Sequence, residues 1–156
     1  MTNERLQKMG SLCVATVLGA GYFPLAPGTM GSLVGVALIW FLKSFSIGLM
    51  VVVILLLSGA GVWASQKAGQ VFGVADSPHI VIDEVVGMLI TMLAIPITLY
   101  WLAWGFIMFR VFDVFKPPPA NFFDARMKNG WGVMLDDVFA GIYGNVLLHF
   151  MIRAQL

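Results

Sequence analysis

Long uncharged stretches dominate the pattern of this chain. Formal charges are absent from residues 9–42, 44–66, 85–109 and 138–152. A membrane-spanning helix needs roughly 20 apolar residues, so the first three stretches are long enough and the fourth is marginal. Glycines and prolines divide these stretches into about six expected helices, which we place at 10–20, 29–41, 47–71, 80–95, 98–115 and 131–152. The pattern predicts an all-α, compact, polytopic membrane bundle.

The topology of this bundle depends on Pro96. The uncharged stretch around it fits either one kinked span, about 37 Å long at 1.5 Å per residue, or two helices that turn at the proline. One span would place Asp83 and Glu84 across the membrane from Arg110 and Asp113. A turn brings all four side chains to the same side. We therefore predict a hairpin at Pro96.

Composition supports lipid as the surrounding solvent. Hydrophobic residues make up 60% of the 156 residues and charged residues 11%, against about 25% charged in soluble proteins. With the hairpin, seven of the nine basic residues lie on one side, which the positive-inside rule makes cytoplasmic. The first helix is too short to cross and is expected to be interfacial or re-entrant. The net charge of +1 gives no pull toward nucleic acid. Residues 1–156 are expected to form one domain, and the sequence does not specify its oligomeric state.

Acidic residues are few and are placed in apolar surroundings. Five of the eight lie in apolar helical segments: Asp83, Glu84, Asp113, Asp136 and Asp137. Ionisable groups at membrane depth are costly, and clustered carboxylates repel one another unless a cation or protons intervene. Oxygen ligands favour a hard cation, so we predict that these five residues bind Mg²⁺. The alternative is that the acids stabilise helix N-termini.

Two further segments suggest an anionic substrate beside this metal. Arg110, Asp113 and Lys116 recur at steps of three, which keeps them within one sector of a helix. The alternative is that the cations snorkel at a membrane boundary. The second segment, with the sequence PGTMGS at 27–32, opens a helix with small residues and free N–H groups. It makes Gly28, Thr29, Gly31 and Ser32 candidates for substrate binding, or an ordinary N-cap.

These segments together resemble one known family. The motifs PGTMGS (27–32), IDEVVG (82–87), FRxxDxxKP (109–117) and DDxxAG (136–141) occur in this order. The chain resembles the phosphatidylglycerophosphatase A family of bacterial membrane lipid phosphatases over roughly residues 19–143. It departs from the family pattern at Pro118, where a tryptophan is expected, and at Asn129, where a glycine often stands. These departures concern the shape of a loop.

The resemblance implies Mg²⁺-dependent removal of the terminal phosphate from phosphatidylglycerophosphate, which yields phosphatidylglycerol at the cytoplasmic side of the bacterial inner membrane. The residues that match family motifs are Asp83, Glu84, Arg110, Asp113, Lys116, Asp136 and Asp137, and Asp76 and Asp124 match further acidic positions. On this hypothesis Arg110 and Lys116 stabilise transferred charge, and Asp137 or Glu84 is the general base. The alternatives are a non-enzymatic cation carrier and a phosphatase of another phosphate ester.

Overall fold

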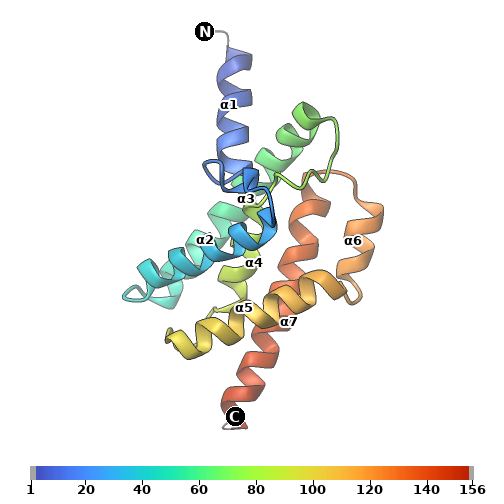
Figure 1. The fold of residues 1–156 in the computed structure, drawn as a ribbon. Coiled ribbons are helices and arrows are strands. Elements are labelled where there is room, and N and C mark those ends of the chain that lie inside the picture. Colours follow the sequence, from blue (N-terminus) through green and yellow to red (C-terminus); the bar gives the residue numbers. More distant parts are fainter. Residues whose placement is uncertain (1–2, 155–156) are drawn as a thin grey trace.

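The computed structural model describes residues 3–154, apart from the side chain of Asp124, and this part is entirely helical (Figure 1). Its elements are α1 (Asn3–Ala15), η1 (Ala20–Tyr22), α2 (Pro27–Leu42), α3 (Ile47–Phe72), α4 (Ile82–Thr91), α5 (Leu99–Phe115), α6 (Ala120–Arg126) and α7 (Gly130–Arg153). The prediction of an all-α helix bundle is confirmed.

The predicted hairpin at Pro96 is present. The helix α4 ends at Thr91 and α5 begins at Leu99, so the uncharged stretch forms two helices. Ala94 adopts a left-handed conformation with φ 59°, and Thr98 caps α5 by accepting a hydrogen bond from the Trp101 N–H at 3.3 Å. The turn therefore returns the chain toward the end of the bundle where α4 starts.

A side chain from α7 satisfies the backbone at the end of α4. The Asn145 Nδ2 donates to the carbonyl oxygens of Thr91 at 3.0 Å and Leu93 at 2.8 Å. The last carbonyls of a helix have no partner within the helix, and an unpaired buried carbonyl is costly. The amide of Asn145 thus makes it possible for α4 to end inside the bundle.

The helix α4 forms the centre of the molecule. It packs against α2, α3, α5 and α7, and Figure 1 shows it enclosed by these longer helices. Val86, Met88 and Leu89 on α4 are fully buried. Its approach to α7 is very close, because a Cβ atom added to Gly141 would lie 2.5 Å from the carbonyl oxygen of Gly87. Small residues of this kind permit tight helix packing in membranes.

The outside of the bundle is apolar. Phe41 is 78% exposed, Leu56 69% and Phe150 65%, and such residues occur on α2, α3, α5 and α7. The helices α3 and α7 are long and apolar enough to cross a membrane. The ten residues of α4 cover about 15 Å, roughly half of the hydrocarbon thickness, so α4 is not a spanning helix.

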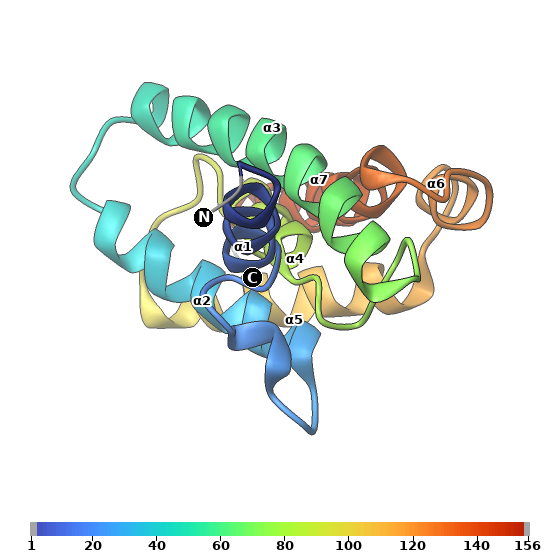
Figure 2. The same cartoon turned by 90° about the horizontal axis from the view of Figure 1, so that it is seen from above.

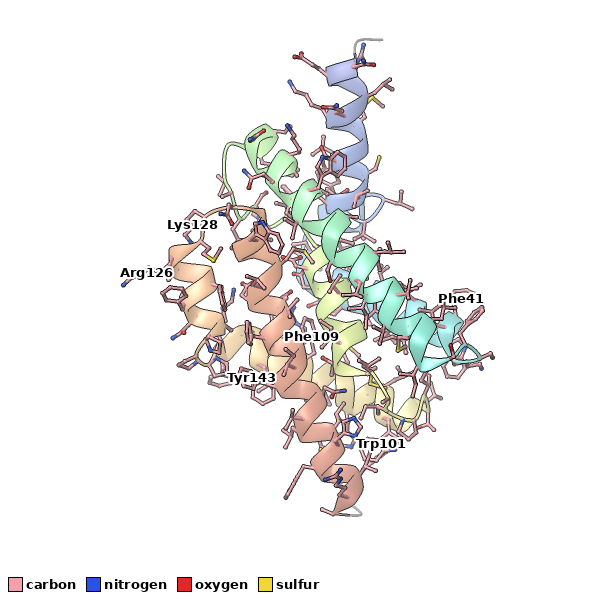
Figure 3. All side chains as sticks on the ribbon, turned by 180° about the vertical axis from the view of Figure 1, so that it is seen from behind. Phe41, Trp101, Phe109, Arg126, Lys128 and Tyr143 are labelled. Atoms are coloured by element: carbon pink, nitrogen blue, oxygen red, sulfur yellow. The ribbon has the colours of Figure 1, made fainter. Side chains whose placement is uncertain are left out.

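The labelled side chains mark two ends of the bundle. Lys128 lies toward the end that carries α1, and Trp101 lies toward the opposite end (Figure 3). The polar loop between α3 and α4 lies at the same end as α1 (Figure 1). Lys128 and this loop therefore lie at one end of the bundle, and the predicted topology places both on one side.

The predicted first helix, 10–20, is misplaced. The helix α1 covers Asn3–Ala15, and Val17, Leu18 and Gly19 then take positive φ values of 49°, 56° and 97°. The reason is a tertiary contact, because the N–H of Val81 donates to the Ala15 carbonyl oxygen at 2.8 Å and fixes the end of α1 beside the start of α4.

Residues 116–130, where no helix was expected, contain α6. The proline run before it ends α5, and Pro119 then serves as the N-cap of a new helix. Phe123 of α6 stacks on Phe139 of α7 with ring centroids 5.2 Å apart. This packing, which no local pattern shows, stabilises the seven-residue helix.

Replacement of Asn145 should destabilise the fold. We expect Asn145→Ala to lower the free energy of unfolding by about 1–3 kcal/mol, since two carbonyls at the end of α4 lose their donor. Thermal unfolding in detergent measures the change, with the exposed Asn121→Ala on α6 as the control. An equal melting temperature for both variants would show that the contact contributes nothing.

Candidate active site

Four helices and one loop meet at a cavity of about 300 Å³. The start of α2, the loop before α4, the first turn of α4, the end of α5 and the second turn of α7 form its wall. The wall consists of Pro27, Gly28, Asp76, Ser77, Pro78, Ile80, Asp83, Glu84, Arg110, Asp113, Val114, Lys116, Asp136 and Asp137. All five predicted metal ligands and both predicted cations therefore line one cavity.

Three carboxylates in the cavity have the spacing of metal ligands. Asp83, Glu84 and Asp137 each offer an oxygen atom, and these atoms lie within 4.8 Å of one another. The contact between Gly87 and Gly141 explains this arrangement, since Gly87 lies three residues after Glu84 and Gly141 lies four residues after Asp137. One turn of each helix thus brings its acids to the shared interface.

The other two carboxylates form ion pairs with the cations of the cavity. Arg110 Nη1 lies 2.5 Å from Asp113 Oδ2, and Lys116 Nζ lies 2.5 Å from Asp136 Oδ2. Lys116 ends α5 in a left-handed conformation with φ 42°, where its N–H donates to the Phe112 carbonyl oxygen at 2.8 Å. Three acids therefore have ligand spacing and two hold cations, and Asp113 of the second group also lies beside Asp137.

The surroundings of the acids on α4 disfavour their charged forms. Burial, followed by the charge of Glu84, raises the pKa of Asp83 well above its usual range. Burial also raises the pKa of Glu84. Both groups lie in the first turn of α4, outside the two helices that are long enough to span. A cation among these carboxylates would oppose the repulsion that burial strengthens.

The donor set of the cavity fits a hard divalent cation. Asp83, Glu84 and Asp137 supply only oxygen atoms, which Mg²⁺ prefers. The Oε2 atom of Glu84 is buried, and it has no hydrogen-bond partner among the described residues. A buried carboxylate oxygen without a donor is costly, and a bound cation would satisfy it.

The glycines of α2 allow this helix to approach the acids. A Cβ atom added to Gly28 would collide with Glu84 Oε1 and would lie 3.3 Å from Arg110 Nη1. A Cβ atom added to Gly31 would lie 2.8 Å from the carbonyl oxygen of Val81. Gly28 thus faces the cavity, and Gly31 packs against the chain that leads into α4.

The structure brings only part of the predicted anion-binding segment to the cavity. Pro27 and Gly28 line the wall, and Thr29, Gly31 and Ser32 do not. The hydroxyl of Ser32 is fully buried and donates to the Gly28 carbonyl oxygen at 2.9 Å. It therefore points back along α2, away from a substrate in the cavity.

The loop before α4 supplies cavity residues that its local sequence pattern does not indicate. Asp76, Ser77 and Pro78 line the wall, where the Asp76 carboxylate repels the Asp136 carboxylate. The loop is fixed by His79, whose Nδ1 lies 3.0 Å from the Gly21 carbonyl oxygen. The match of Asp76 to an acidic family position was the only signal for this loop.

The side chain of Asp124, the other acidic position that the resemblance suggested, lies outside the described residues.

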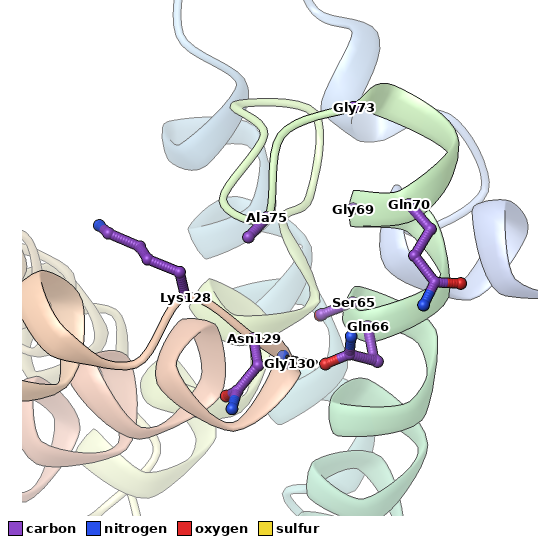
Figure 4. A pocket seen from close by; sticks show the side chains of 9 residues that line it. All are labelled: Ser65, Gln66, Gly69, Gln70, Gly73, Ala75, Lys128, Asn129 and Gly130. Carbon is purple, nitrogen blue, oxygen red and sulfur yellow. Dashed lines mark hydrogen bonds between the residues drawn. The ribbon is translucent and has the colours of Figure 1, made fainter.

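A second hollow, of about 270 Å³, lies between the end of α3 and the start of α7 (Figure 4). Its described wall carries no carboxylate, and Gln66 Oε1 there accepts a hydrogen bond from the Gly130 N–H at 2.9 Å. This hollow lies where the end of α3 packs against the start of α7.

Comparisons with known proteins agree on one family. The family model described as phosphatidylglycerophosphatase A matches residues 13–152. A phosphatidylglycerophosphatase A of Escherichia coli (strain K12) is 38% identical over 140 residues, which cover 88% of this chain and 81% of the relative. Another, from Haemophilus influenzae, is 36% identical over 152 residues, which cover 94% and 93%.

A third relative carries a different name. A protein of Bacteroides thetaiotaomicron, provisionally named a phosphatidylinositol-3-phosphatase, is 37% identical over 144 residues, which cover 86% of this chain and 89% of the relative. No solved structure matches the chain.

The helical bundle, its cavity of acids and cations, and these relatives define a phosphatase. The expectation of an enzyme is confirmed, and the carrier alternative finds no support. The chain belongs to the phosphatidylglycerophosphatase A family.

A methyl group at Gly28 should disturb this site. We expect Gly28→Ala to lower kcat about a hundredfold, because the new Cβ displaces the Glu84 carboxylate and crowds Arg110. Phosphate release measures the loss. The control is Gly59→Ala on α3, where a Cβ atom meets no neighbour within 4 Å. Equal activity in the two variants would contradict the close approach of α2 to the acids.

Proposed function

We propose that this protein hydrolyses the terminal phosphate monoester of phosphatidylglycerophosphate and releases phosphate and phosphatidylglycerol, with Mg²⁺ as its cofactor. One observation carries the proposal: a single cavity combines three carboxylates at ligand spacing with Arg110 and Lys116. The names of the Escherichia coli and Haemophilus influenzae relatives support this choice of substrate.

The metal would be held by Asp83, Glu84 and Asp137. When bound there, Mg²⁺ supplies neutralisation of phosphoryl charge and lowers the pKa of a coordinated water. The first two ligands come from the buried centre of the bundle and the third from α7, so the packing of α4 against α7 sets the spacing of the donors.

Arg110 and Lys116 would bind the phosphoryl oxygens. The planar guanidinium of Arg110 can donate two parallel hydrogen bonds, and the Lys116 ammonium acts as a point charge. Their partners Asp113 and Asp136 hold both side chains at the cavity wall. Cations preset in this way stabilise the charge of the transferring group without reorganisation during the reaction.

The reaction needs one bond to form and one to break. A water oxygen bonds to phosphorus, and the bond between phosphorus and the glycerol oxygen breaks. The proton of the water passes to a carboxylate oxygen of Glu84 or Asp137. The same carboxyl group then gives this proton to the glycerol oxygen, which leaves as a hydroxyl.

A phosphorylated inositol lipid is the second candidate substrate. The name of the Bacteroides thetaiotaomicron relative favours it. Both candidates are phosphate monoesters on a lipid headgroup, so the same cavity serves either. Phosphate release from the two lipids at equal surface concentration separates them. A higher kcat/KM on the inositol lipid would reverse our assignment.

The cavity would face the cytoplasm from a multi-pass position in the bacterial inner membrane. The exposed apolar side chains of α2, α3, α5 and α7 and the two spanning-length helices support the membrane position, and the predicted grouping of basic residues supports the orientation. A headgroup could then react at the cavity while its acyl chains remain in the bilayer.

Loss of a single ligand or of the metal should abolish the reaction. We expect chelation to stop phosphate release by the wild type and added Mg²⁺ to restore it. Asp137→Asn should lower kcat at least a hundredfold, because the amide removes a charged ligand or the base. The control is Glu4→Gln on the exposed part of α1. Unchanged activity of the Asp137 variant would remove this residue from the site.

The proposed orientation can be measured by cysteine labelling. Cys13 is the only cysteine of the chain, so Cys13→Ser provides a background without thiols. In that background, Lys128→Cys should react with an impermeant maleimide only from the cytoplasmic side, and Ser44→Cys only from the opposite side. The reverse pattern, or labelling of both from one side, would exclude the proposed topology.

A further inference from the structure

The outward face of α5 carries a continuous apolar stripe. Tyr100, Ile107, Val111 and Val114 are 53%, 46%, 39% and 71% exposed. Their spacing of seven, four and three residues follows the helical period, so they lie in one row along the helix. The row is about 21 Å long at 1.5 Å per residue, which exceeds the roughly 15 Å of hydrocarbon in one leaflet.

This stripe, Tyr100–Ile107–Val111–Val114, ends at the candidate active site. Val114 belongs to the cavity wall, together with Arg110, Asp113 and Lys116 on the adjacent face of α5. The cavity therefore has an exposed apolar edge beside its cations. A lipid whose phosphate lies in the cavity has a continuous apolar surface leading away from Val114.

A second part of the cavity wall is also apolar. Pro27 lines the wall, and Leu25, two residues earlier, is 87% exposed. The turn between η1 and α2 that contains Leu25 protrudes beyond α5 (Figure 2). The cavity wall thus includes Val114 at the end of the α5 stripe and Pro27 close to a protruding turn.

We propose that the α5 stripe binds the acyl chains of the substrate lipid while its phosphate occupies the cavity, an inference that rests on the proposed function. The exposed apolar face of α3, which includes Val52 and Leu55, differs in one decisive respect: none of its residues belongs to the cavity wall. Continuity with the cavity distinguishes the α5 stripe from an ordinary lipid-facing surface.

The test compares matched serine pairs on two substrates. Ile107→Ser with Val111→Ser weakens the stripe, and Val52→Ser with Leu55→Ser is the control on α3; none of the four residues lines the cavity. Phosphate release is measured in mixed micelles from long-chain phosphatidylglycerophosphate and from the same headgroup with four-carbon chains, which are too short to follow the stripe.

We expect the α5 pair to lower kcat/KM about tenfold on the long-chain lipid, from the loss of a few methylene contacts, and to leave the short-chain substrate unaffected. The α3 pair should change neither. If the α5 serine pair lowers the melting temperature, Ile107→Ala with Val111→Ala replaces it, and a smaller loss confined to the long-chain lipid is expected.

Three results would overturn the inference: no loss with the α5 pair, an equal loss with the α3 pair, or an equal loss on both substrates. The first result would show that the stripe does not contact the substrate. The second would show that the loss comes from a general change in micelle binding. The third would show that the substitutions disturb the cavity itself. A wild type that releases phosphate from neither lipid would instead overturn the proposed function, and this is known before any variant is compared.

Discussion

The backbones of α4 and α7 touch where Gly87 meets Gly141, and the positions of the acids depend on this contact. A side chain at either glycine would separate the helices and move Asp83 and Glu84 away from Asp137. The contact also requires α4 to lie inside the bundle, where the carbonyl groups at its C-terminal end need partners from the protein. Asn145 supplies them from the same helix, α7, that supplies the third acid. One pair of helices therefore provides both the site and the support for its central element.

Much of this arrangement can be inferred from the sequence, because charge is scarce in the chain. In an apolar sequence each carboxylate is conspicuous, and the requirement that Asp83, Glu84, Arg110 and Asp113 share one side was enough to predict the turn at Pro96. The structure confirms that turn, and it gathers the five acids and two cations in one cavity. The clustering of charged residues that are distant in sequence could be predicted here, because isolated charges buried in lipid would be costly.

Features that arise from packing between distant segments could not be predicted from the sequence. The end of α1 is set by a hydrogen bond from Val81, and α6 is stabilised by Phe139. Neither partner is near in sequence. The segment at 27–32 shows the same limit, since its small residues suggested backbone contacts to a ligand. In the structure, Gly31 faces another part of the chain and the Ser32 hydroxyl bonds within its own helix.

The balance of charge on the cavity wall has a consequence for the order of binding. Six carboxylates and two cations line the cavity, so the acids outnumber the basic groups by four. A phosphate monoester carries up to two more negative charges and is repelled by such a wall. On the proposed function, this excess of negative charge therefore sets the order of binding. A metal ion or protons bind first and neutralise the wall, and the lipid headgroup binds afterwards.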